Sequence, residues 1–295
     1  MELSIIIPTH NRADILSLCL KHINEQTLPH QNFEIIVIDD GGTDHTKDII
    51  CEWQKTLPNL IYFHQDNSGQ GNARNHALKY AEGEIILFIG DDILLEKTAL
   101  EEHLLAHKKH SEKNSAVLGL ILWHPDMKVT KFMTWLTKGK KGGTQFAFDL
   151  LGNKETADYR FFYTSNISLK HDILKKHRFD PEFESYGWED IELGYRLFKE
   201  ENLKIYYQKS AVGYHDHEID ERSLKNRMIS IGKSAKIFHK KHPKLKINPP
   251  FWKHAILWLI SRKPTLLISR IANKDFYYYS LSKRYFLKGF GSSRK

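Results

Sequence analysis

Hydrophobic and polar positions alternate in blocks along the first 110 residues. Four short runs are almost wholly apolar, as buried strands are, and they span residues 3–7, 33–38, 60–64 and 84–89. After each run, apolar residues recur at helical spacing, over residues 13–26, 46–56, 71–81 and 97–110. Apolar strands separated by single helices are typical of a parallel sheet covered on both faces. The pattern therefore predicts an α/β fold with a Rossmann-like, mostly parallel central sheet flanked by helices.

The unusual polar residues fall in the four segments that follow the predicted strands. These segments are Pro8-Thr-His-Asn-Arg12, Asp39-Asp-Gly-Gly-Thr-Asp44, the loop from Asp66 to Asn75, and Gly90-Asp91-Asp92. Each one alone also fits a turn or a helix cap. Because parallel strands end at one edge of a sheet, where ligands of such folds bind, the four loops together indicate a site.

The chain lacks the two common glycine-rich motifs that bind phosphate groups. No G-x-G-x-x-G follows the first predicted strand and no G-x-x-x-x-G-K-[ST] occurs anywhere. A divalent cation held by carboxylates replaces such loops in some enzymes, with phosphate oxygens completing its shell. Asp91 and Asp92 are the candidates for that role.

Two further clusters lie in the second half. The segment from Phe183 to Leu197 contains Tyr186-Gly-Trp-Glu-Asp190 and then a helical apolar pattern. The segment Ala211 to His217 follows a short predicted strand and carries His215 and His217, either of which could complete a metal shell. From about residue 221 the pattern predicts helices rich in basic and aromatic residues.

The motifs of the first 110 residues resemble family 2 glycosyltransferases with the GT-A fold. The stretches that carry the resemblance are "SIIIPTHNR", "VIDDGGTD", "NSGQGNARNHAL" and "EIILFIGDD", in the family's order. The resemblance implies that the nucleotide-sugar is bound by Pro8, His10, Arg12, Asp40, Arg74, Asp91 and Asn166. It also implies that Asp92 ligates Mn²⁺ or Mg²⁺, with His215 chosen over His217. The chain departs from the common D-x-D form at Ile89, where many members have the first acidic residue.

The stretch "YGWEDIELGYRL" is similar to the W-G-x-E-D motif of inverting transferases such as the galactosyltransferase-like and chondroitin-polymerase-like branches. On that resemblance Asp190 is the catalytic base, Glu189 orients the acceptor, and Trp188 with Tyr186 stacks on a sugar ring. The alternatives are an acidic first helical turn, with Glu192 and Arg196 paired on its exposed side, and a packing role for Trp188.

Composition narrows the remaining choices. The 295 residues carry a net charge of +8, with much of the excess after residue 220, which suits an anionic partner or a solvated surface. Cys19 and Cys51 have no metal-type spacing and are predicted to be buried free thiols in a reducing compartment. No apolar run is long enough to span a membrane. We expect a cytoplasmic protein. The basic, aromatic tail suggests either peripheral contact with the acidic inner face of the cell membrane, or packing on the domain or on another subunit.

The predicted organisation is a nucleotide-sugar-binding half at 1–110, an acceptor-binding and catalytic half at 111–220, and a helical basic extension at 221–295. The resemblance implies an inverting, metal-dependent hexosyl- or N-acetylhexosaminyl-transferase. Its donor would be a nucleotide-sugar, UDP-linked as first choice, and its acceptor a glycan or lipid-linked molecule in bacterial cell-surface polysaccharide synthesis. The alternatives are a non-catalytic nucleotide- or glycan-binding protein and a nucleic-acid binder, the latter disfavoured because no such motif is present.

Overall fold

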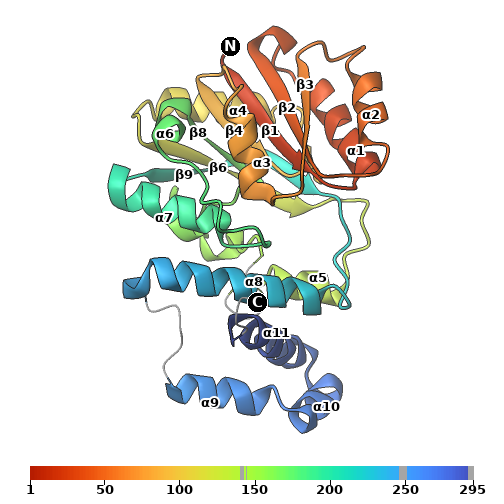
Figure 1. The fold of residues 1–295 in the computed structure, drawn as a ribbon, viewed down its shortest axis with the longest axis vertical. Helices are drawn as coiled ribbons and strands as arrows, with labels where there is room; N and C mark the ends of the chain where they lie inside the picture. The colour runs from red at the N-terminus through yellow and green to blue at the C-terminus, as the bar shows by residue number, and fades with distance from the viewer. Residues whose placement is uncertain (140–142, 144, 246–250, 292–295) are drawn as a thin grey trace. The chain divides into compact units, whose positions relative to one another are not determined.

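The computed structural model describes residues 1–139, 143, 145–245 and 251–291 (Figure 1). The chain forms two compact units. The first comprises Met1–Met127, Leu151–Glu184 and Asp190–His217, and the second comprises Lys128–Leu150, Ser185–Glu189 and Glu218–Lys295. The predicted boundaries at residues 110 and 220 remain a prediction.

The first unit is built on a mixed sheet, which has nine strands among the described residues. Its order is β3-β2-β1-β4-β8-β6-β9-β5, with β7 paired to β9. The bounds are β1 Leu3–Thr9, β2 Phe33–Asp40, β3 Leu60–Gln65, β4 Ile85–Ile89, β5 Ile93–Leu95, β6 Ser115–Trp123, β7 Thr156–Ala157, β8 Asn166–Lys170 and β9 Lys204–His215. Strands β3, β2, β1 and β4 are mutually parallel, whereas β8 runs antiparallel to its neighbours β4 and β6.

Helices of the first unit follow the strands much as the pattern predicted. They are α1 Ala13–Asn24, α2 Thr46–Trp53, α3 Gln70–Ala77, α4 Ala99–Lys109, α6 His171–Lys176 and α7 Glu189–Glu201, with short 3₁₀ turns η1 His30–Asn32 and η4 Tyr159–Phe161. Helix α3 packs on β1 and β2, and α4 packs on β6 and β9. The predicted α/β fold with flanking helices is therefore confirmed. Strands β5, β6 and β7 were not predicted, and the short strand predicted before Ala211 continues as β9 to His215.

The sheet opens where β1 and β4 end. The pairing of β1 with β2 continues to Thr9, but its pairing with β4 stops at Ile6, opposite Phe88. Pro8 lies in the stretch that has no β4 partner, where its missing N–H costs no ladder bond. The strand therefore runs two residues beyond its predicted end at Ile7. Diverging neighbours at the carboxyl end of a parallel sheet form the crevice in which such folds bind ligands.

The core of the first unit is dominated by its central strands. Every residue of β1, β2 and β4 is buried, as expected for strands covered on both faces. Of the two cysteines, Cys19 is buried and Cys51 is exposed, and both are free thiols. The prediction that both are buried is wrong for Cys51, which lies on the solvent side of α2.

The second unit is helical, which confirms the predicted C-terminal extension. It contains α5 Lys131–Leu136, α8 Leu224–Lys241, α9 Phe251–Ile260, α10 Lys263–Ala272 and α11 Lys274–Gly291, with η3 Phe148–Leu150 and η5 Pro243–Leu245. Helices α8 and α11 approach closely through Gly232 and Gly289, because a Cβ at Gly289 would lie 2.1 Å from the Ile229 carbonyl oxygen. In the described part of the chain, no helix combines the length and apolarity needed to cross a membrane.

Candidate active site at the carboxyl end of the sheet

Arg12 joins the two adjacent aspartates that follow β4. Its Nη1 donates to Asp91 Oδ1 at 2.7 Å, and its Nη2 donates to Asp92 Oδ2 at 2.9 Å. The planar guanidinium thus spans two carboxylates that would otherwise repel each other. Arg12, Asp91 and Asp92 were each predicted as site residues, and the structure brings them together at the carboxyl ends of β1 and β4, where the two strands are no longer paired.

Asp91 is the more deeply held of the two aspartates. It is 4% exposed, and Thr9 donates to its Oδ2 at 2.8 Å. Burial, together with the charge of Asp92 beside it, raises the pKa of Asp91 to about 7. Thr9 was not among the predicted site residues, although it lies inside the stretch that resembles the family's first loop.

His215 reaches Asp92 through the register of two strands. Ile93 of β5 pairs with His215 of β9, and the Asp216 N–H donates to the Asp92 carbonyl oxygen at 2.9 Å. The imidazole Nε2 consequently lies 3.5 Å from Asp92 Oδ2. Burial acts to raise the pKa of Asp92, but the charges of His215 and Arg12 outweigh it and hold that pKa below its ordinary value.

The two histidines that the sequence left as alternatives differ in their surroundings. His215 is buried and its ring makes an edge contact with Trp123 at 5.1 Å between centroids. His217 is exposed, with its ring centroid 6.3 Å from that of His215. His215 lies within ion-pair distance of Asp92, and the charge of His217 also acts on Asp92. The choice of His215 over His217 as metal ligand therefore remains a prediction.

A bulge in β9 directs its second half toward Asp92. The pairing of β6 with β9 shifts between Gly119, opposite Gln208, and Leu120, opposite Val212. Asn166 fills the irregularity, since its Nδ2 donates to Ala211 O at 3.0 Å and to Leu120 O at 3.3 Å. Its side chain satisfies carbonyl groups that the broken ladder leaves without a strand partner.

Two histidines of α4 complete this buried network. The pKa of His103 is lowered to about 4 and that of His107 to about 3, mainly by burial, so both imidazoles are neutral near pH 7. His103 Nε2 lies 2.9 Å from Asn166 Oδ1, and its Nδ1 lies 2.8 Å from Ser168 Oγ. Because the amide oxygen can only accept, the proton of His103 is on Nε2 and the Ser168 hydroxyl donates to Nδ1. His107 Nε2, at 2.9 Å, then donates to the same hydroxyl.

This placement does not suit the predicted contact between Asn166 and the donor. The residue is 0% exposed. Its Oδ1 is hydrogen-bonded to His103 and its Nδ2 to the Ala211 carbonyl oxygen. As it lies, the side chain cannot touch a ligand in the crevice, and its role is to hold the β9 bulge. The family resemblance implied the contact with the donor, whereas the hydrogen bonds of the side chain depend on the strand irregularity that it fills.

We expect Asn166→Ala to destabilise the first unit by about 2 to 4 kcal/mol, because it leaves buried carbonyl groups and the His103 N–H without partners. Urea unfolding followed by circular dichroism measures the change. Asn114→Ala is the matched control, because Asn114 also donates to backbone carbonyl groups but is partly exposed and outside the bulge. Equal effects of the two substitutions would contradict the assigned role.

Asp40 holds the loop between β3 and α3. Its Oδ1 accepts from Gln65 Nε2 at 2.7 Å and from the Ser68 N–H at 2.9 Å, and its Oδ2 accepts from the Gly69 N–H at 2.8 Å. Gly69 has φ +91°, and a Cβ there would lie 2.7 Å from the Glu184 carbonyl oxygen, so only glycine fits. The predicted contact of Asp40 with a nucleotide base remains a prediction.

The loops after β1 and β2 are tied to each other. His10 Nδ1 lies 2.9 Å from the Asp40 carbonyl oxygen, which also accepts from Asn67 Nδ2 at 2.9 Å. Asn11 Oδ1 accepts from the Thr43 N–H at 2.7 Å. His10 is exposed at this rim, where a ligand can reach it.

Arg74 lies deeper than expected. It is 3% exposed on α3, with its guanidinium 5.6 Å from the ring centroid of Phe179 and an Nη2 bond to Gln70 Oε1 at 3.3 Å. Its predicted approach to a base or pyrophosphate remains a prediction.

Asp190 stands in the first turn of α7. Its Oδ1 accepts from the Ile191 N–H at 2.7 Å, and its side chain is partly exposed, whereas Glu189 is buried. Glu192 and Arg196 form the i, i+4 pair that was weighed against a catalytic role, at 2.9 Å. That pair is confirmed, but Glu192 is 1% exposed, so it is not on the exposed side.

The residues that precede α7 have a strained backbone. Gly187 has φ +95° and Trp188 has φ +74°, a region that costs a non-glycine residue about 1–3 kcal/mol. Within the second unit, the Trp188 ring contacts Phe238 of α8 at 4.9 Å between centroids, and the Arg227 guanidinium lies 4.6 Å over the exposed ring of Tyr186. The packing alternative thus accounts for part of the Trp188 surface. The predicted stacking of Tyr186 and Trp188 on a sugar remains a prediction.

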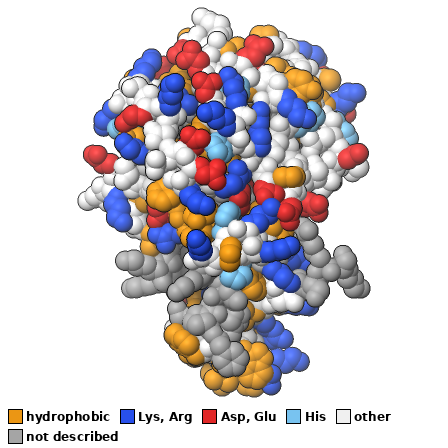
Figure 2. Space-filling model, turned by 60° about the vertical axis from the view of Figure 1, so that its left-hand side comes forward, with side chains coloured by type: hydrophobic (Ala, Val, Ile, Leu, Met, Phe, Trp, Pro, Cys, Tyr) orange, Lys and Arg blue, Asp and Glu red, His pale blue; other side chains and the backbone are white. Residues whose placement is uncertain are grey.

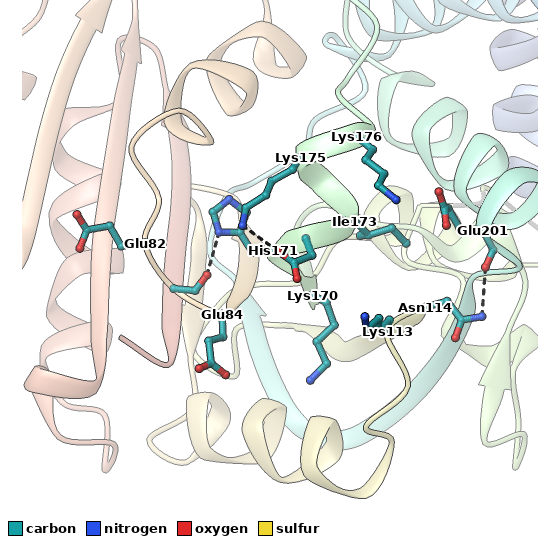
Figure 3. Close-up of a pocket in the computed structure, with 12 residues that line it drawn as sticks. Glu82, Glu84, Lys113, Asn114, Lys170, His171, Ile173, Lys175, Lys176 and Glu201 are labelled. Carbon is teal, nitrogen blue, oxygen red and sulfur yellow. Dashed lines mark hydrogen bonds and ion pairs between the residues drawn. The ribbon is translucent and has the colours of Figure 1, made fainter.

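A cavity of about 700 Å³ lies at the other end of β4 (Figure 3). Its lining includes Glu84, Lys170, His171 and Glu201, and the His171 Nδ1 bonds to the Gly83 carbonyl oxygen at 3.0 Å. Gly83 and Glu84 precede β4, whereas Asp91 and Asp92 follow it. The cavity is therefore separate from the polar crevice, and its lysines are balanced by carboxylates among the lining residues.

Comparison with known proteins identifies the family. The model of the family described as "Glycosyl transferase family 2" matches residues 4–178, which is more than half of the chain and includes the crevice residues from Thr9 to Asp92. The chain belongs to glycosyl transferase family 2. The resemblance carried by the four N-terminal motifs is thereby confirmed.

Two curated relatives differ in how much of this chain they match. Validoxylamine A glucosyltransferase from Streptomyces hygroscopicus subsp. jinggangensis is 28% identical over 283 residues, covering 85% of this chain and 63% of the relative. Poly(ribitol-phosphate) beta-glucosyltransferase from Bacillus spizizenii is 38% identical over 102 residues, covering 34% of this chain and 16% of the relative. The family 2 chain thus spans less than two thirds of the length of each.

Solved structures share the fold of this family 2 protein. The mannosyltransferase PcManGT from Pyrobaculum calidifontis, in complex with GDP-Man and Mn²⁺, aligns with a TM-score of 0.67 at 18% identity, covering 98% of this chain and 85% of that one. S. aureus TarS 1-349 in complex with UDP-GlcNAc aligns with a TM-score of 0.57 at 20% identity, covering 98% and 92%. At these identities the likeness concerns the fold alone.

The possible metal ligands near the ends of β1 and β4 fit a divalent cation only in part. Asp92 supplies a carboxylate oxygen and His215 an imidazole nitrogen, a combination that suits Mn²⁺ better than Mg²⁺. Over the described residues, no group of three His, Cys, Asp or Glu side chains is arranged to hold an ion. A cation bound here would therefore take its other ligands from the phosphates of a nucleotide and from water.

Proposed function

We propose that this family 2 chain is an inverting, divalent-metal-dependent glycosyltransferase. Its donor is a nucleotide-sugar, UDP-linked as first choice, and its acceptor is a hydroxyl of a glycan or lipid-linked molecule in cell-surface polysaccharide synthesis. The observation that carries the proposal is the Arg12 bridge to Asp91 and Asp92, with His215 beside it, in the crevice between β1 and β4. The donors and acceptors named for the relatives support this class of reaction.

The residues at the carboxyl ends of β1 and β4 would have different roles in binding the donor. Asp92 and His215 would hold the cation, which when bound offsets the negative charge that develops on the departing nucleoside diphosphate. Arg12 keeps both aspartates in place, because each of its two Nη groups donates to one of the carboxylates. His10, exposed at the rim, would contact the nucleoside.

Asp190 would act on the acceptor. Inversion requires one base that removes the proton of the acceptor hydroxyl while its oxygen attacks the anomeric carbon from the side opposite the leaving group. The bond between anomeric carbon and diphosphate oxygen breaks as the new glycosidic bond forms, and the proton passes to Asp190. Glu189, Trp188 and Tyr186 would orient the acceptor.

Release of nucleoside diphosphate from a panel of donors tests the proposal. The full chain and Mn²⁺ are incubated with UDP-glucose, UDP-N-acetylglucosamine or GDP-mannose. The released UDP or GDP is measured with and without EDTA. We expect EDTA-sensitive hydrolysis of at least one UDP-sugar. Absence of turnover with every donor, together with retained UDP binding, would instead favour a non-catalytic nucleotide-binding protein.

A further inference from the structure

Helices α9 and α10 of the second unit carry large apolar side chains on their outer surface. Those that are more than half exposed are Trp252, Trp258 and Leu259 of α9 and Leu267, Ile268 and Ile271 of α10. Ile271 is 91% exposed. We call these six side chains the α9–α10 surface. Apolar side chains clustered in this way usually mark an interaction surface, whereas single exposed ones do not.

The second unit does not need this surface for its own packing. In α10 the buried residues are Leu266 and Ser269, and α10 packs on α11. Leu267 and Ile271 are four residues apart and therefore share a face of the helix that differs from the buried one. Helix α10 thus has two apolar sides, one of which is covered within the unit and the other exposed.

Positive charge surrounds the α9–α10 surface. Residues 251–274 contain five lysines and arginines and no aspartate or glutamate. The Arg262 guanidinium lies 4.3 Å from the centroid of the Trp258 ring. A positive charge therefore lies directly beside one of the exposed aromatic side chains. In Figure 2, hydrophobic side chains gather beside Lys and Arg side chains in the lower part of the view, where Figure 1 draws α9 and α10.

We propose that the α9–α10 surface docks on an acidic lipid bilayer. Apolar and tryptophan side chains would enter the boundary between headgroups and acyl chains, while Arg262, Lys263 and Arg270 contact anionic headgroups. The contact is peripheral, since none of the helices described is able to cross a membrane. It goes beyond the proposed chemistry and does not depend on it.

A second copy of the chain is a poorer occupant of this surface. A symmetric dimer places the same patch of both copies face to face. Because residues 251–274 have no acidic side chain, the lysines and arginines of the two copies would meet without partners. Anionic headgroups supply the complementary charge that a second copy lacks.

Vesicle flotation with the full chain tests the docking. The probes are vesicles of phosphatidylcholine alone and vesicles that also contain phosphatidylglycerol, without any nucleotide-sugar. We expect binding to the acidic vesicles, weaker binding to the neutral ones, and a decrease with added salt. Arg262→Gln and Lys263→Gln should each weaken binding to acidic vesicles about fivefold, and Leu267→Ser combined with Ile271→Ser should abolish it.

Leu105→Ser is the matched control, because Leu105 is 55% exposed on α4 of the first unit and should leave flotation unchanged. Thermal melts check that the variants fold, as expected for exposed positions. Absence of binding to acidic vesicles would overturn the proposal. So would a dimer in analytical ultracentrifugation that dissociates in the Leu267/Ile271 double variant while vesicle binding persists. Loss of donor hydrolysis with intact flotation would affect only the proposed function.

Discussion

Asp190→Asn is expected to lower sugar transfer by about 10²- to 10⁴-fold, the range that a positioned general base contributes. The asparagine cannot remove the acceptor proton, but its side-chain oxygen can still accept from the Ile191 N–H, as Asp190 does at 2.7 Å. The start of α7 should therefore remain intact. Transfer is followed by release of UDP in the presence of acceptor, and binding of UDP with Mn²⁺ is followed by thermal shift.

Glu200→Gln is the control on the same helix, because Glu200 is exposed near the far end of α7. We expect it to keep nearly full activity. Full transfer by Asp190→Asn would show that another group is the base, while loss of UDP binding along with transfer would point to a folding defect at the start of α7.

Asp92→Asn is expected to remove most of the stabilisation that UDP with Mn²⁺ confers. Ligand at about 100 times its Kd adds about 2.7 kcal/mol, which for a chain of this size raises the melting temperature by about 5 to 10 °C. Without the Asp92 charge, the Kd for Mn²⁺ should rise at least about tenfold, since even the partners of metal ligands contribute that much. Titration of Mn²⁺ followed by electron paramagnetic resonance measures it directly.

His215→Asn and His217→Asn form a matched pair for the same site. His215 Nε2 lies 3.5 Å from Asp92 Oδ2, whereas His217 is exposed. We expect weaker Mn²⁺ binding only for His215→Asn. If His217→Asn alone weakened it, the ligand assignment would be reversed, and if neither did, the cation would be held elsewhere.

Several of the structural expectations could be made from sequence because they depend on neighbouring residues. Strands β1, β2 and β4 are apolar at most positions on both faces, a pattern that burial on two sides requires. The polar loops had to follow those strands, and parallel pairing had to bring them to one edge. The grouping of Arg12 with Asp91 and Asp92 is a consequence of that topology.

Other features depended on contacts between distant segments. Asn166, Ala211 and Leu120 are brought together by antiparallel and parallel neighbours of one sheet, and no local signal marks the β9 bulge. Likewise, Trp188 carries a positive φ that its residue type disfavours, and only the surrounding structure can impose it. These are the positions at which local preference and tertiary structure disagree.

The sequence by itself determined the α/β fold, the family and the edge of the sheet where the carboxylates lie, because periodicity and loop order are local properties of the chain. Tertiary structure decided where the side chains near that edge lie: it buried Asn166 and Arg74, brought Thr9 to Asp91, and placed His215 Nε2 3.5 Å from Asp92 Oδ2. The physical reason is that strand register and the β9 bulge fix where each side chain points, and both are set by pairing between segments far apart in the chain.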